Sequence, residues 1–147
     1  MQVWRTSEPL LVPIDFGGVK RLDLEFVGVR RDRGSFTAFV FVNPGELPSD
    51  AGRDHDTFVG SFTIFAPSWC WGAEGHCDWK RPPVSAFDRR GPHHLIPINV
   101  SMEITDAIER LGNPDELTVT VHAALRNDPE AAEGVLVFDE LQALAYQ

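Results

Sequence analysis

Apolar and polar residues alternate along several short segments of this chain, which is the period of strands that bury one face. The clearest run extends from Arg21 to Val29, where Leu22, Leu24 and Phe26 occupy every second position. A second run, from Ser35 to Asn43, is rich in Phe and Val, which favour strands. Both segments are therefore predicted to be strands of a half-buried sheet.

The two runs are separated by a turn-like sequence. Asp32, Arg33 and Gly34 have the composition of a tight turn, so the two strands are predicted to form a hairpin. Arg30 and Arg31 add to a small basic cluster here. A solvated turn explains the cluster better than a basic patch that docks on an acidic partner.

Further strands are predicted along the chain. Thr57 to Ala66 forms a strong run, and Gly60 within it indicates a bulge or a close backbone approach. His94 to Ser101 follows, with Pro97 indicating an edge or a bulge, and Leu117 to Ala123 alternates again.

Both ends of the chain carry weaker signals. Leu10 to Phe16 is a candidate edge strand. Gly134 to Tyr146 closes the chain, and either a strand or a helix is possible after Asp139. The residues expected to face inward there are Val135, Val137 and Leu141.

One helix is predicted, from Met102 to Leu111. Ser101 is its expected N-cap, and Gly112 is expected to end it. Its apolar stripe consists of Ile104, Ile108 and Leu111, which lie at positions i, i+4 and i+7.

Many short strands, one short helix and closely spaced turns are typical of an all-β protein. The prediction is a jelly-roll-like β-sandwich in which residues 1–147 form a single domain. The periodic pattern is absent between residues 67 and 93, so a long loop is expected there. Loops of this length in compact domains are often functional.

Composition narrows the class of partner. The chain has 147 residues, enough for a hydrophobic core, and a formal net charge of −9, which argues against binding to nucleic acid. No apolar stretch reaches the roughly 18–20 residues of a membrane span. The N-terminus lacks the features of a signal peptide. The expected location is the cytoplasm, or a larger precursor of which this chain is a part.

Four segments together resemble a known family. FVFVN at 39–43 and FVGSF at 58–62 are followed by ITDAIERLG at 104–112 and DELTVTV at 115–121. In this order and spacing they resemble the C-terminal domain of plant-type polyphenol oxidases and related tyrosinases (catechol oxidases). The resemblance covers the chain from about residue 22 to residue 137.

The resemblance implies a β-sandwich that packs over the entrance of a dicopper oxidase core and holds the enzyme latent. The core of that family binds two coppers through six histidines on helices. This chain has five histidines, spread over predicted loops and strands, and no helical pair of them. We therefore expect a non-catalytic accessory domain whose partner is a tyrosinase-like catalytic domain or subunit.

The long loop departs from the family, whose plant-type members have a shorter connection here. It carries the candidate metal ligands Cys70, His76, Cys77, His93 and His94. Thiolate and imidazole are ligands that Cu(I) and Zn(II) prefer, although the spacing matches no standard zinc motif. Related fungal domains use cysteines to pass copper to the core. The two cysteines could instead form a local disulfide or remain unpaired thiols.

The loop also contains Trp69, Trp71 and Trp79. Tryptophan is enriched at interface hot spots, so these side chains could anchor a partner. A lid folded back on the sandwich is slightly favoured, because three exposed indoles would promote aggregation.

Three other features have ordinary structural explanations. His122 is predicted to be a satisfied histidine within a sheet, and Asn99 begins a glycosylation sequon that we discount without a secretory signal. A solvated loop, rather than a weak cation site, is expected for Asp50, Asp54, His55 and Asp56.

Two rival functions remain open. The chain could be a free-standing copper or zinc protein that uses Cys70, His76 and Cys77. It could also be a sandwich enzyme with a new site in the 67–93 loop.

Overall fold

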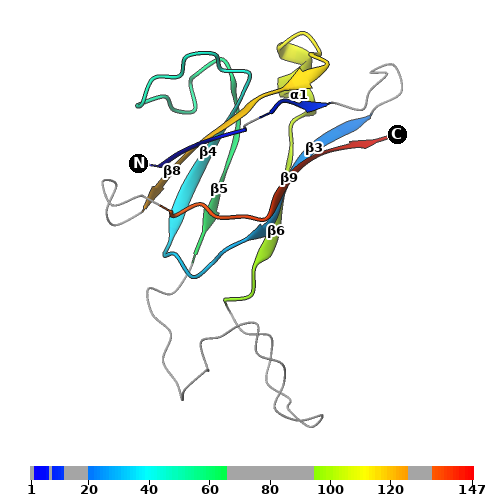
Figure 1. The fold of residues 1–147 in the computed structure, drawn as a ribbon. Coiled ribbons are helices and arrows are strands. Elements are labelled where there is room, and N and C mark those ends of the chain that lie inside the picture. Colours follow the sequence, from blue (N-terminus) through cyan, green and yellow to red (C-terminus); the bar gives the residue numbers. More distant parts are fainter. Residues whose placement is uncertain (1, 7, 12–19, 66–94, 126–133) are drawn as a thin grey trace, which may run out of the picture.

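The computed structural model describes residues 2–6, 8–11, 20–65, 95–125 and 134–147. Their strands form two antiparallel sheets that pack face to face, with a short strand pair beside them (Figure 1). The four-stranded sheet has the order β1 (Gln2–Arg5), β8 (Val119–Leu125), β4 (Phe36–Val42) and β5 (Phe58–Ile64). The three-stranded sheet has the order β6 (Ile98–Glu103), β3 (Arg21–Val29) and β9 (Glu140–Tyr146), and the pair consists of β2 (Leu10–Leu11) and β7 (Glu116–Leu117). The prediction of an all-β sandwich is confirmed.

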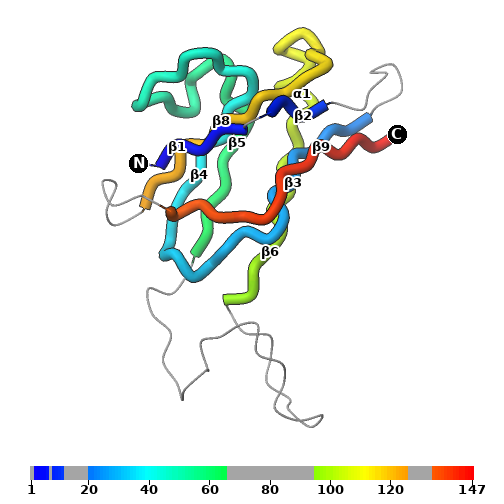
Figure 2. Tube along the Cα trace, in the orientation of Figure 1, coloured from blue at the N-terminus to red at the C-terminus, as the bar shows by residue number. Residues whose placement is uncertain are grey.

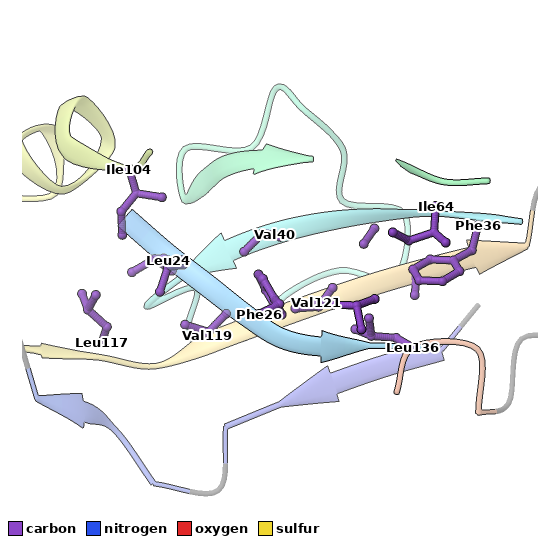
Figure 3. Packing of buried hydrophobic residues seen from close by; sticks show 14 of the residues in the cluster. Leu24, Phe26, Phe36, Val40, Ile64, Ile104, Leu117, Val119, Val121 and Leu136 are labelled. Carbon is purple, nitrogen blue, oxygen red and sulfur yellow. The ribbon is translucent and has the colours of Figure 1, made fainter. Parts of the chain in front are cut away.

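The hydrophobic core lies between the two sheets. Figure 3 shows Leu24 and Phe26 of β3 directed toward Val40 of β4 and Val121 of β8. All four side chains are fully buried. Leu24, Phe26 and Val121 come from the apolar half of alternating runs, whereas Val40 lies between Phe39 and Phe41, which point to the opposite face. The alternation in the sequence therefore identified the core strands correctly.

The predicted hairpin between the first two runs is wrong. β3 lies between β6 and β9, whereas β4 lies between β8 and β5, so the two strands belong to different sheets. Both edges of each strand are already paired, and residues 30–35 cross from one sheet to the other. Asp32 forms ion pairs with Arg30 and Arg33 at this crossing. Alternation shows that a strand has one buried face, but it does not show which strand lies beside it.

The expectation for Gly60 is confirmed on both counts. Val40 pairs with Gly60 and Phe41 pairs with Phe58, so Val59 is an extra residue and forms a bulge. A Cβ atom at Gly60 would lie 2.5 Å from Sδ of Met102 on β6. The two sheets approach closely here, so a side chain at position 60 would require the side chain of Met102 to shift.

The helix is shorter than predicted. α1 spans Thr105–Arg110, and Met102 and Glu103 belong to β6 instead. Ser101 is therefore not the N-cap; its hydroxyl donates a hydrogen bond to Asp23 at 3.0 Å. Residue Ile104 occupies the N-cap position without a side-chain hydrogen bond. Strand pairing with β3 holds these residues extended, which outweighs their helical periodicity.

Gly112 follows the helix with φ +83°, as its predicted role in ending the helix requires. Asn113, the next residue, also has positive φ, at 53°. Neither conformation is common for residues other than Gly and Asn.

The remaining strands differ in detail from expectation. The last described segment is a strand, β9, in which Leu141 packs on the core, while Val135 is buried and Val137 is partly buried. The expected strand from 117 to 123 is divided at Thr118 into β7 and β8. β6 begins at Ile98, one residue after Pro97, and lies at a sheet edge as predicted.

The N-terminal strands were predicted only in part. Within the candidate strand 10–16, the structure describes Leu10–Leu11 as β2 and does not describe residues 12–16. β1 was not predicted, yet it extends the four-stranded sheet beside β8, as Figure 2 also shows. Oε1 of Gln2 on β1 accepts a hydrogen bond from the backbone N–H of Leu136 at 2.8 Å, which joins segments from opposite ends of the chain.

Asn43 connects the end of β4 to the break between β7 and β8. Its Oδ1 atom accepts hydrogen bonds from the backbone N–H of Thr118 at 2.6 Å and from the Thr118 hydroxyl at 3.1 Å. Its Nδ2 atom donates to the carbonyl of Glu116 at 3.1 Å. Asn43 has φ +47°, a conformation that Asn adopts more readily than most residues. The Val-Asn motif thus has a structural role.

Asn99, the sequon residue, also has a structural role. Val27 and Gly28 face a single residue of β6, which makes a bulge in β3. Oδ1 of Asn99 accepts a hydrogen bond from the N–H of Gly28 at 3.1 Å, and Nδ2 donates to Glu25 at 3.4 Å. The side-chain amide is therefore used to stabilise the bulge.

Across the described ranges, no helix has both the length and the apolar character needed to cross a membrane.

Candidate interaction surface

All five predicted metal ligands lie outside the described residues, as do the three tryptophans of the loop. Cys70, His76, Cys77, His93 and His94 fall between residues 66 and 94. The strands that flank this segment are β5 and β6, and in Figure 1 the end of β5 and the start of β6 lie at the same end of the sandwich. The metal site therefore stays a prediction.

Two histidines are described, and both contact the ring of Phe41. Between ring centroids, His55 lies 5.8 Å from Phe41, and His122 lies 5.3 Å from Phe41. Nδ1 of His55 is 2.9 Å from the hydroxyl of Thr57. Among the described segments, no group of three or more His, Cys, Asp or Glu residues could hold a metal ion.

His122 is buried in β8, as predicted, but it is not fully satisfied. The residue is 1% exposed, and its Nδ1 atom has no hydrogen-bond partner among the described residues. Burial lowers the pKa of His122, and the positive charge of Arg5 lowers it further. A neutral imidazole is favoured here, because protonation would place a second positive charge in a desolvated position.

The outer surface of the four-stranded sheet, which we call the β1–β5 face, contains His122. The alternate residues of these strands pack in the core, so the remaining side chains point away from it. No Asp or Glu occurs in β1, β8, β4 or β5. The outward residues are Val3, Arg5, Thr37, Phe39, Phe41, Phe58, Ser61, Thr63, Thr120, His122 and Ala124, of which Phe41, Thr120 and His122 are buried within the chain.

Aromatic rings pack at the centre of the β1–β5 face, where Phe41 is fully buried and Phe39 and Phe58 are partly buried. Phe58 lies 6.4 Å from Phe39 and 5.8 Å from Phe41 between ring centroids. The guanidinium of Arg53 lies 6.0 Å from the ring of Phe39, and its Nη2 donates to Ser61 at 3.3 Å. The four strands of this sheet carry no carboxylate, although the whole chain is acidic, and the nearest ones, Asp54 and Asp56, follow Arg53 in the adjoining loop.

A groove of about 690 Å³ lies beside this face, between residues 53–59 and α1. Its lining includes the carboxylates of Asp54, Asp56, Glu103 and Asp106, together with Arg53 and Arg110. Arg110 donates to the carbonyl of Phe58 at 3.2 Å. Carboxylates outnumber guanidinium groups, so the groove is acidic. Three members of the predicted acidic loop, Asp54, His55 and Asp56, line it.

The outer surface of the three-stranded sheet is different in character. It carries Arg21 and Asp23, joined by a hydrogen bond of 2.7 Å, and the acidic residues Glu25, Glu103 and Glu140 occur in the same sheet. The hydrogen bond from Arg21 holds the pKa of Asp23 below its usual value, and Ser101 adds a second bond. This face is polar and charged, as expected of a solvated sheet surface.

Fold and surface together define an all-β sandwich in which the described residues supply no group of three or more metal-binding side chains. No family model matches the sequence, and no curated protein matches it. Solved structures do match. A latent aurone synthase (polyphenol oxidase) aligns with a TM-score of 0.57 at 13% identity, and latent apple tyrosinase aligns with 0.56 at 16%.

These alignments cover 98% and 99% of this chain but only 24% and 26% of the two oxidases. The chain thus has the fold of one part of polyphenol oxidases and spans about a quarter of their length. The resemblance indicated by the order of the sequence motifs is confirmed at the level of the fold. It is consistent with the C-terminal domain of that family.

Sequence reasoning did not identify Arg5, Arg53 or the β1–β5 face. A signal was available, because the segments that form β4, β5 and β8 contain no charged residue in a chain with 22 acidic ones. The sequence alone does not show that these three segments lie in one sheet.

Proposed function

We propose that this chain is a non-catalytic accessory domain that docks on a tyrosinase-like dicopper oxidase core and shields its entrance. The observation that carries this proposal is the extent of the structural alignments: nearly the whole chain aligns with about a quarter of each oxidase. Both oxidases are named as latent enzymes, which supports a shielding role.

The histidine content supports a non-catalytic role. A dicopper core of the resembled family uses six helical histidines, and this chain has five in total. The described helix α1 contains none, and the two described histidines lie in a loop and in a strand. Oxidation of diphenols would thus require the partner core.

Assistance with copper loading is the second part of the proposal. Cys70, His76 and Cys77 provide two thiols and an imidazole within eight positions, and His93 and His94 follow. Thiolates are soft ligands that favour Cu(I), and Cu(I) tolerates low coordination numbers. This donor set would hold copper for transfer, with His93 and His94 available as further ligands.

The test begins with the genome that encodes this chain. A tyrosinase-like core should be encoded in the same reading frame or nearby. The purified core should oxidise catechol, and the rate should fall when the accessory chain is bound. The chain alone, loaded with copper, should not exceed a free-copper control. Catechol turnover by the chain alone, lost on replacing its histidines, would contradict the proposal, as would a genome without such a core.

A further inference from the structure

Charge is divided unevenly between the two sheets of the sandwich. The three-stranded sheet contains Asp23, Glu25, Glu103 and Glu140, whereas the four-stranded sheet contains no acidic residue. In a chain with a net charge of −9, a solvated sheet surface would be expected to carry carboxylates. Depletion of charge at the centre of a patch is typical of a protein interface.

The centre of the β1–β5 face contains no charged residue. Strand register places Val3, His122, Phe39 and Ser61 in one row across the four strands. Val3 is 46% exposed, whereas His122 is buried and its Nδ1 atom has no partner among the described residues. The imidazole of His122 is already desolvated within the chain, so the apolar surface that this row exposes comes from Val3 and, in part, from Phe39.

Two arginines lie at this face. Arg5 is exposed on β1, and Arg53 lies over Phe39. Neither forms an ion pair with any residue in the described ranges. A guanidinium group stacked on an aromatic ring retains donors that can bind a carboxylate from another molecule.

From this arrangement we infer that the β1–β5 face is the surface that binds the oxidase core, through an apolar patch on the core flanked by carboxylates that pair with Arg5 and Arg53. This inference rests on the function proposed above. A second copy of this chain fits less well, because in a symmetric pair the same face would supply no carboxylate to either arginine. Nucleic acid fits less well too, because the adjacent groove is acidic.

The test measures binding of the accessory chain to the core by calorimetry, with matched substitutions on the two faces. On the β1–β5 face the variants are Val3→Asp, Arg5→Glu and Arg53→Glu. The controls are Tyr146→Asp and Lys20→Glu at the three-stranded sheet. Tyr146 is 48% exposed, close to the 46% of Val3, so the two aspartate substitutions perturb similarly exposed positions.

Each substitution on the β1–β5 face should raise Kd about tenfold or more, and the controls should change it less than about threefold. Arg5→Glu should also slow association at low salt, since it reverses the charge that attracts the carboxylates. Urea denaturation of every variant checks that it is folded, and Arg53→Glu, which lies outside the strands, keeps the test valid if a β1 variant unfolds.

The outcomes separate the two proposals. If the unaltered chain fails to bind the core, the proposed function and this inference both fall. If the chain binds and only the controls weaken binding, the inference is overturned and the proposed function survives. Self-association that is lost in Arg5→Glu would identify a second copy as the occupant and would also overturn the inference.

Discussion

Asn43 allows the stability of this fold to be tested with a matched pair of substitutions. Asn43→Ala removes three side-chain hydrogen bonds, two from Thr118 to Oδ1 and one from Nδ2 to the carbonyl of Glu116. It also places alanine at φ +47°, in the left-handed region. Both effects act at the point where β4, β7 and β8 meet.

The magnitude follows from these two contributions. A left-handed conformation costs an ordinary L-residue about 1 kcal/mol or slightly more. Each lost hydrogen bond near the surface contributes about 0.5–1 kcal/mol, because water replaces part of it. The free energy of unfolding should therefore fall by about 2.5–4 kcal/mol. A domain of this size is expected to be stable by about 5–15 kcal/mol, so most of it should remain folded.

Asn113 provides the control. It has φ +53°, similar to Asn43, and its side chain makes no hydrogen bond to the described residues. Asn113→Ala should cost only the backbone contribution, about 1 kcal/mol. Urea titrations followed by circular dichroism give both values, and an unchanged m-value shows that the denatured state is comparable. If the two variants differ by less than about 0.5 kcal/mol, the hydrogen bonds of Asn43 do not stabilise the fold as argued.

Three further predictions concern other parts of the molecule. Gly60→Ala should lower the free energy of unfolding by about 1–3 kcal/mol, because the new Cβ meets Met102 Sδ; a double-mutant cycle with Met102→Ala should show coupling above about 0.5 kcal/mol, and additive effects would contradict the contact. Because the folded-state pKa of His122 is lowered, the unfolded chain binds a proton first, so stability should decrease as pH falls below about 6.5. His122→Leu should flatten this dependence in urea titrations at a series of pH values, and an unchanged slope would refute the assignment. Replacement of Cys70 and Cys77 by Ser should abolish stoichiometric Cu(I) binding, measured by quenching of tryptophan fluorescence, while circular dichroism stays unchanged; a native disulfide between them would exclude the copper role.

The sequence by itself determined the fold class and most of the core. Leu24, Phe26 and Val121 are recognisable as core residues because a strand places alternate side chains on opposite faces, and this is a local property. Gly60 indicated a bulge and a close approach for a similar local reason, since it interrupts an otherwise strong strand. The order of motifs also indicated the family whose fold the chain shares.

Which strands lie beside one another was decided only by the tertiary structure. β3 and β4 are adjacent in sequence yet lie in different sheets, and β1 pairs with β8 across more than a hundred residues. Met102 lies in a strand despite a helical pattern around it, because pairing with β3 supplies hydrogen bonds that local propensity does not anticipate. The β1–β5 face exists for the same reason. Its residues come from four separate segments, and only their pairing assembles them into one face whose strands carry no carboxylate.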